Sequence, residues 1–90
     1  MARPFEVSEG LQDILKKLAK KDKSLHEQVM KKIHEIVYSG DIEHYKNLKY
    51  NMKDSKRVHI GHFVLMFQYD KKKDSILLDD FDNHDKIYKR

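Results

Sequence analysis

Ninety residues with 39% hydrophobic and 38% charged side chains predict one soluble domain over residues 1–90. A chain this short cannot divide into two independent cores, and this one is too apolar to be disordered. The absence of cysteine excludes disulfides, thiol catalysis and cysteine-based metal sites, and no apolar run approaches the roughly 18 residues of a membrane span. Because Met1-Ala2-Arg3-Pro4 does not read as a signal peptide, we expect a cytoplasmic protein with no membrane partner.

The first half of the sequence predicts a short strand and a helical hairpin. Residues 5–7 alternate apolar and polar side chains, which is typical of a strand. Ser8 can then cap a helix whose apolar stripe has helical spacing: Leu11, Ile14, Leu15 and Leu18. Ser24 and Glu27 have the spacing of a capping box, so we expect a second helix to begin there. Gly40 is expected to end it, because glycine tolerates the left-handed conformation that closes helices.

The second half predicts strands that follow a polar, basic loop over residues 41–54. Period-two alternation indicates three sequential antiparallel strands, over 55–60, over 63–69 and from 75–78 onward. Gly61 is expected in the first turn, and residues 79–90 are expected to form a short C-terminal tail. The order β-α-α-β-β-β predicts an α+β fold, with the helical hairpin on one face of a small, mainly antiparallel sheet and the other face free for function.

Positive charge is concentrated between His44 and His62. This window holds five Lys or Arg and one Asp, so its net charge is +4. That is also the net charge of the whole chain. Aromatic residues interleave with the cations, as expected where phosphates are neutralised and bases stack. The alternative is a solvated face that keeps a loop soluble. In the nucleic-acid interpretation the phosphates are bound by four lysines: Lys46, Lys49, Lys53 and Lys56.

Three short patterns together resemble a known family. They are the K-x-L at Lys46–Leu48 before the sheet, the R-V-x-I-G at Arg57–Gly61 and the final H-x-x-x-Y at His84–Tyr88. In this order and spacing the chain resembles the RelE/ParE superfamily of toxins from toxin–antitoxin pairs over residues 5–88. The resemblance implies a RelE-like fold and an mRNA endoribonuclease that acts within the translating ribosome and is neutralised by a cognate antitoxin.

The sequence departs from the ribonuclease pattern at two places. Many ribonuclease members carry an arginine in the second strand of the hairpin, where this chain has Val64. They also carry cations before the last tyrosine, where this chain has residues 82–85, Asp-Asn-His-Asp. The ParE branch inhibits DNA gyrase without catalytic residues, so a gyrase inhibitor is one alternative. An inactive member that binds only RNA or an antitoxin is another.

Cleavage of RNA without a metal or cofactor needs a base for the 2′-hydroxyl, an acid for the leaving 5′-oxygen and cations for the charge on phosphorus. His84 is expected to act as base or acid, because imidazole titrates near neutrality. Arg57 and His59 alternate on one strand and can contact one phosphate. Tyr88 lies one helical turn after His84 and can stack a base or donate its phenol, or it can simply anchor the C-terminus.

A metal-dependent nuclease is the competing chemistry. Asp80, Asp82 and His84 alternate, so an extended tail would place three potential Mg²⁺ or Mn²⁺ ligands on one side. Consecutive acidic residues near a chain end are usually solvated. The interpretation we carry forward therefore has no metal site.

Overall fold

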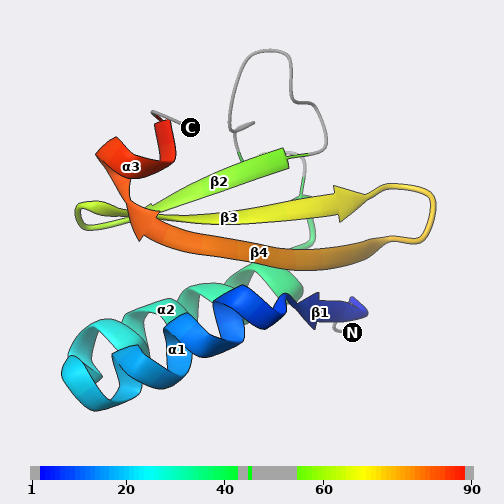
Figure 1. Ribbon diagram of the computed structural model, residues 1–90. Coiled ribbons are helices and arrows are strands. Elements are labelled where there is room, and N and C mark those ends of the chain that lie inside the picture. The colour runs from blue at the N-terminus through cyan, green and yellow to red at the C-terminus, as the bar shows by residue number, and fades with distance from the viewer. Residues whose placement is uncertain (1–2, 43–44, 46–54, 89–90) are drawn as a thin grey trace.

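The fold is a helical hairpin packed on one face of a four-stranded mixed sheet (Figure 1). The computed structural model describes residues 3–42, 45 and 55–88. Its elements are β1 (Phe5–Val7), α1 (Glu9–Lys21), α2 (Lys23–Val37), β2 (Ser55–Ile60), β3 (Phe63–Asp70), β4 (Ser75–Asn83) and α3 (His84–Tyr88). The predicted α+β class and element order are confirmed, with α3 added after the last strand. Within the described ranges, no helix has the length and apolar character needed to cross a membrane.

The sheet has the strand order β1-β4-β3-β2. β2 pairs with β3 and β3 with β4 in antiparallel fashion, whereas β1 pairs with β4 in parallel, with Phe5 opposite Ile76. β4 continues to Asn83, which lies opposite Phe63. The prediction that residues 79–83 belong to a tail is therefore wrong. The acidic side chains of this segment obscure its strand pattern in the sequence. Phe81, between them, is buried in the core.

A bulge in β4 is tied to the start of α1. Met66 lies opposite Asp80 and Phe67 opposite Leu78, so Asp79 is an extra residue in the ladder. The hydroxyl of Ser8 donates to the Asp79 carbonyl at 2.7 Å and accepts from the Leu11 N–H at 3.1 Å. The predicted Ser8 cap is confirmed, and the same side chain fixes α1 against β4.

The ends of α2 differ from the prediction. Asp22, not Ser24, caps the helix, since its carboxylate accepts from the Leu25 N–H at 3.1 Å. Only Asp22 separates α1 from α2, so the hairpin turns more tightly than a capping box at Ser24 would require. The C-terminal cap is Tyr38, and Gly40 is not in the left-handed region. The helix therefore ends where predicted, but for a different reason.

The main core lies between the helical hairpin and the sheet (Figure 1). Its fully buried residues come from both layers: Leu11, Val29 and Ile36 from the helices, and Leu65, Phe67 and Leu78 from the sheet. A second, smaller core lies on the opposite face, where Val64 packs with Ile87 of α3, and Met66 and Tyr88 pack against them. That face was expected to be free, but α3 covers part of it.

Candidate active site

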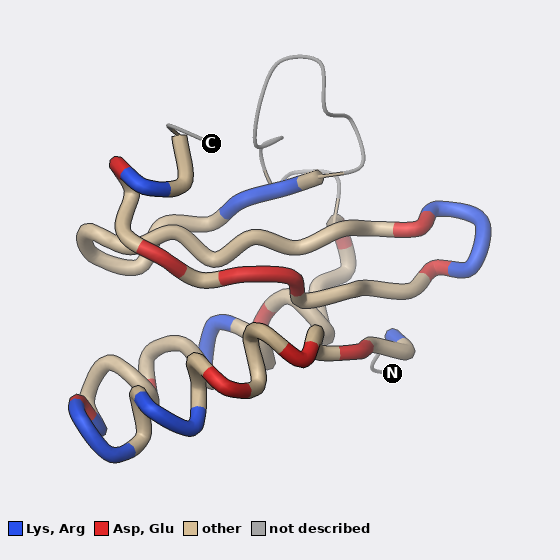
Figure 2. Tube along the Cα trace, viewed as in Figure 1, with Lys and Arg blue, Asp and Glu red and all other residues tan. Residues whose placement is uncertain are grey.

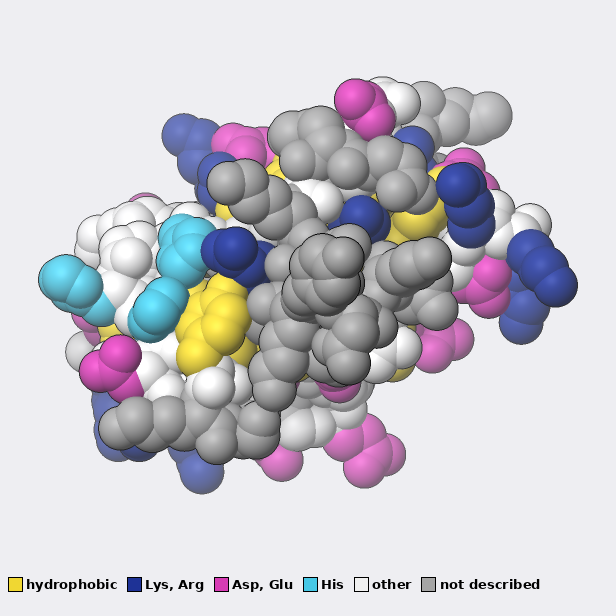
Figure 3. Space-filling view, turned by 90° about the horizontal axis from the view of Figure 1, so that it is seen from above, with side chains coloured by type: hydrophobic (Ala, Val, Ile, Leu, Met, Phe, Trp, Pro, Cys, Tyr) yellow, Lys and Arg dark blue, Asp and Glu magenta, His cyan; other side chains and the backbone are white. Residues whose placement is uncertain are grey.

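β2 and α3 bring the four predicted catalytic residues together. Strand alternation places Arg57 and His59 on the outer face of the sheet, where their cross-strand partners are Met66 and Val64 of the second core. α3 begins at His84 directly after β4 and lies over that same face. Figure 3 shows histidine side chains gathered beside a basic and a hydrophobic group at one end of the molecule.

Contacts connect these four side chains into one group, which we call the four-residue cluster. The Nη1 atom of Arg57 lies 2.8 Å from Nε2 of His59, and its Cζ lies 5.6 Å from the ring centroid of Tyr88. The rings of His59 and His84 stack with their centroids 5.3 Å apart, and those of His84 and Tyr88 are 4.6 Å apart. The cluster thus holds one guanidinium, two imidazoles and one phenol.

The bond between Arg57 and His59 defines the tautomer of the histidine. A guanidinium can only donate, so Nε2 of His59 is the acceptor and the ring proton resides on Nδ1. The Nδ1–H group of His59 can therefore act as a donor. Arg57 is half-buried whereas His59 is exposed, so the pair presents its imidazole to solvent.

Backbone interactions set the position of His84. Its N–H donates to the carbonyl of His62 in the β2–β3 turn at 2.9 Å. The side chain of Asn83 accepts from the Asp85 N–H at 2.9 Å and begins the helical turn, and the Asp85 carboxylate lies 3.6 Å from Nδ1 of His84. An open depression of about 300 Å³ lies beside these residues, lined also by Gly61. There is room for a substrate group next to the imidazole.

The sequence did not reveal the part played by His62 and Asn83. His62 contributes through its backbone carbonyl, which no side-chain pattern could indicate. The Asn83-His84-Asp85 sequence is a readable signal, because asparagine often caps a helical turn. It was obscured by the expectation of an extended acidic tail.

Tyr88 serves as an anchor as well as a member of the cluster. Its ring packs against the second core beside Ile87 and Val64. Its hydroxyl is buried and makes no hydrogen bond to any residue in the described ranges. The anchoring alternative is therefore compatible with the contacts to Arg57 and His84, since the ring does both.

Of the predicted phosphate-binding lysines, the structure describes Lys56, which does not join the cluster. Lys56 is only 3% exposed, and its Nζ donates to the Tyr45 carbonyl at 3.3 Å. Because it precedes Arg57 in the strand, it points to the opposite face of the sheet. Lys46, Lys49 and Lys53 lie outside the described residues.

The metal-site alternative does not fit the observed backbone. Asp80 and Asp82 belong to β4, but His84 is the first residue of α3, so the extended alternation is broken before it reaches the imidazole. Nowhere in residues 3–42, 45 and 55–88 do three potential ligands gather in a way that could hold a metal ion.

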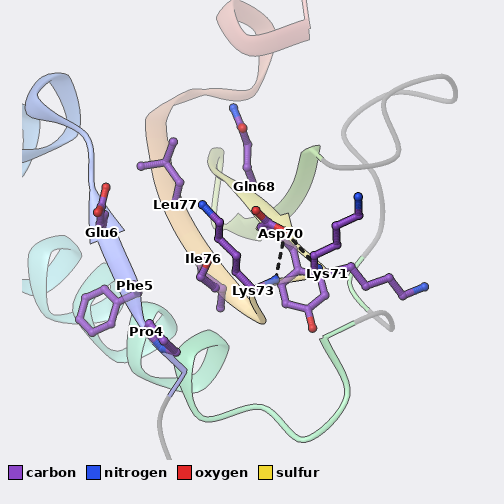
Figure 4. Close-up of a pocket in the computed structure, with 12 residues that line it drawn as sticks. Pro4, Phe5, Glu6, Gln68, Asp70, Lys71, Lys73, Ile76 and Leu77 are labelled. Carbon is purple, nitrogen blue, oxygen red and sulfur yellow. Dashed lines mark hydrogen bonds between the residues drawn. The ribbon is translucent and has the colours of Figure 1, made fainter.

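A larger depression lies at the other end of the sheet and contains none of the predicted catalytic residues. It has a volume of about 730 Å³ and lies between β1 and the β3–β4 turn, with Phe5 on one side and Lys71–Lys73 on the other (Figure 4). The Asp70 carboxylate accepts from the N–H groups of Lys72 and Lys73 and so orders this turn. Its lining mixes carboxylates with lysines, so it is a weak candidate for an anion site.

Comparison with known proteins places this geometry in context. No protein-family model matches the chain. A protein of Methanocaldococcus jannaschii described as "Putative toxin RelE4" is 43% identical over 87 residues, which are 96% of this chain and 90% of that protein. An uncharacterized protein of Methanosarcina mazei is 44% identical over 85 residues, which are 93% of this chain and 96% of that protein.

Two solved structures share the fold. The E. coli toxin RelE, carrying two arginine-to-alanine substitutions, matches in its free state with a TM-score of 0.70 at 22% identity. The same mutant in complex with a peptide of the antitoxin RelBc matches with a TM-score of 0.67 at 22% identity. Each match covers 99% of this chain and 93% of the other. At this identity the likeness shows the fold alone.

Proposed function

The chain belongs to the RelE family of toxins, and we propose that it is the toxin of a toxin–antitoxin pair: a metal-independent endoribonuclease that cleaves mRNA on the ribosome and so inhibits translation in the cytoplasm. The observation that carries this proposal is the four-residue cluster. Residues distant in sequence supply, in one place, the groups that transfer protons and stabilise phosphoryl charge.

In the proposed reaction the 2′-oxygen of the RNA attacks the adjacent phosphorus and the bond from phosphorus to the 5′-oxygen breaks. His84, which is exposed and lines the depression, accepts the proton of the 2′-hydroxyl. His59 enters the reaction as the imidazolium ion and donates its Nε2 proton to the departing 5′-oxygen. This leaves the neutral ring with its proton on Nδ1 and with Nε2 able to accept from Arg57. The products are a 2′,3′-cyclic phosphate and a 5′-hydroxyl, so no water, metal or cofactor is consumed.

Arg57 stabilises the negative charge that develops on the phosphoryl oxygens. A guanidinium suits this role because it is always charged and can donate two parallel hydrogen bonds to phosphate. The Tyr88 ring beneath its Cζ and the His59 acceptor beside Nη1 hold it in place. Tyr88 is therefore assigned mainly to positioning.

A protein antitoxin is the second part of the proposal. The solved complex of E. coli RelE contains a peptide of its antitoxin RelBc, and this chain shares that fold. We expect the cognate antitoxin to lie against the helical hairpin and the outer face of the sheet, where it covers Arg57. Failure of the two purified proteins to form a stable complex would count against this.

Inhibition of DNA gyrase is the second candidate function. It is favoured by Val64, which is fully buried beneath α3 at the place where the family resemblance leads one to expect an arginine. The cluster consequently has one guanidinium. A supercoiling assay separates the two functions, because inhibited gyrase with intact RNA would replace the ribonuclease assignment.

The decisive experiment adds the purified protein to a translation reaction and maps mRNA 3′ ends on the ribosomes. We expect cleavage that persists in EDTA, is lost with His84→Ala and is retained with His34→Ala. The control histidine is exposed on α2, where its ring stacks on that of Tyr38. Intact mRNA with the unmodified protein, or equal cleavage by the two variants, would refute the proposal.

A further inference from the structure

The tip of the helical hairpin, residues 16–23, is strongly basic and plays no part in the cleavage reaction proposed above. It contains five lysines and one aspartate: Lys16, Lys17, Lys20, Lys21, Lys23 and Asp22. All five lysines are exposed, and none forms an ion pair with any residue that the structure describes. In the same helical layer Lys32 does form one, with Glu35 at 2.9 Å.

Helix stability explains only part of this charge. Lys20 and Lys21 lie in the last turn of α1, where cations complement the helix dipole. Lys23 is the first residue of α2, where a cation opposes the dipole, and the first turn of α2 contains no acidic residue. Lys16 and Lys17 lie before the last turn of α1 and do not pair with Asp13, although the spacing would allow it.

The hairpin tip lies at the same end of the molecule as the four-residue cluster. The β2–β3 turn, α3 and the α1–α2 turn all lie at the left of Figure 1, with the hairpin tip below the sheet and α3 above it. Figure 2 shows blue, basic positions grouped around that tip together with an acidic position at its end. A large polyanion that approaches this end can therefore meet both surfaces.

The chemistry of the hairpin tip indicates which polyanion fits. Residues 16–23 contain no aromatic side chain, so the tip lacks the stacking surfaces with which proteins bind single-stranded bases. Lysines on flexible stems interact with phosphates as point charges and read no sequence. We propose that the hairpin tip is a second RNA-binding surface, which binds the phosphate backbone of double-helical RNA. The choice of RNA over DNA rests on the proposed function.

A duplex-binding measurement with two matched triple variants tests this. The probe is a labelled, blunt RNA duplex of about 20 base pairs, which is longer than the about 16 base pairs that a double-stranded-RNA-binding domain spans. One variant is Lys16→Gln/Lys20→Gln/Lys23→Gln, and the control is Lys71→Gln/Lys72→Gln/Lys73→Gln in the β3–β4 turn. Both remove three exposed positive charges from the full-length protein. Glutamine preserves helix propensity, so both are expected to fold.

The hairpin variant is expected to weaken duplex binding about 10-fold near 0.1 M salt and to flatten the slope of log Kobs against log salt by about 2. The control is expected to change the slope by less than 1. Equal losses in the two variants would show that only net charge matters and would overturn the proposal. So would an unchanged slope in the hairpin variant.

Two further titrations, with duplex DNA and with polyglutamate, test which polyanion the hairpin tip binds. A comparison with the mRNA-cleavage assay separates this proposal from the proposed ribonuclease function. Equally tight, equally tip-dependent binding of duplex DNA would overturn the assignment to RNA. Loss of binding to polyglutamate without loss of binding to the RNA duplex would overturn it in favour of an acidic protein. If the duplex result is as expected but mRNA is not cleaved on ribosomes, the proposed function fails and the RNA-binding surface stands.

Discussion

The guanidinium of Arg57 is hydrogen bonded to Nε2 of His59 at 2.8 Å, from one side chain to the next on the same face of β2. The same guanidinium lies over the ring of Tyr88, which belongs to α3. One arginine therefore connects a strand in the middle of the chain to a helix that follows the last strand. The proposed chemistry depends on this connection, because Arg57 is the cation of the cluster.

Arg57→Lys is expected to lower mRNA cleavage at least about 10-fold while leaving the fold intact, because an ammonium cannot both bond to His59 and lie flat over Tyr88. Single-turnover cleavage rates measure the loss. The control is Arg3→Lys. The guanidinium of Arg3 also lies over a tyrosine ring, that of Tyr69, but neither residue belongs to the four-residue cluster. Cleavage at the unmodified rate by Arg57→Lys would show that a simple positive charge suffices.

Tyr88→Phe is expected to leave cleavage within about 3-fold and to leave stability unchanged or raised by up to about 1 kcal/mol, because the hydroxyl that it removes is buried without a partner. Tyr88→Ala, in contrast, should destabilise the protein by about 3 kcal/mol through the lost ring. Chemical unfolding and cleavage rates are measured for both. If Tyr88→Phe cleaved mRNA 100-fold more slowly, the loss would match the factor of about 10² that a general acid contributes. The phenol would then be assigned as a proton donor.

Gly61→Ala is expected to cost about 1 kcal/mol of stability, because Gly61 has φ +61° and an alanine there is strained even though its Cβ meets nothing within 4 Å. Gly40→Ala is the matched control, with equally open space and no positive φ. Because the neighbouring His62 carbonyl holds the His84 N–H, Gly61→Ala should also slow cleavage. Equal melting temperatures for the two variants would contradict the prediction that alanine is strained at the positive φ of Gly61.

Asp74 is expected to make stability depend on pH. Hydrogen bonds from the Tyr69 hydroxyl and the Arg3 guanidinium hold the pKa of Asp74 below its ordinary value of 3.8. A lowered pKa in the folded state stabilises the protein above the ordinary value, and this contribution is lost as the pH falls through the lowered one.

Asp74→Asn should therefore melt at a lower temperature than the unmodified protein at pH 7, and the difference should disappear as the pH falls through the lowered pKa of Asp74. Asparagine tolerates the positive φ of this position, +49°, so backbone strain does not confuse the comparison. Asp13→Asn is the control, because the exposed Asp13 carboxylate on α1 forms no hydrogen bond or ion pair with any residue that the structure describes. A difference that stays constant from pH 7 down through the lowered pKa of Asp74 would contradict the prediction.

Most of the fold could be predicted because its signals are local. The apolar stripe that begins at Leu11, the Ser8 cap and the left-handed Gly61 each depend on a few neighbouring residues. The parallel pairing of β1 with β4 could not be predicted in the same way. It joins Phe5 to Ile76, and nothing in either short segment specifies a partner so far away in the chain.

The side chains of the candidate site could be predicted from the sequence, but the packing contacts and backbone hydrogen bonds that bring them together could not. Alternation placed Arg57 and His59 on one face, and the spacing of His84 and Tyr88 placed both on one helical turn. Whether the two pairs meet depends on the Val64–Ile87 contact beneath α3 and on the His62 carbonyl. Packing and backbone acceptors of this kind leave no trace in the pattern of residue types.

The pairing of the first strand with the last also constrains when the protein can fold. Among the strands that the structure describes, β1 pairs with β4 alone, and the loop between them closes only after residues 75–83 have been synthesised. The four-residue cluster needs residues up to Tyr88. A nascent chain with its C-terminal third still inside the exit tunnel therefore has neither a closed sheet nor an assembled cluster.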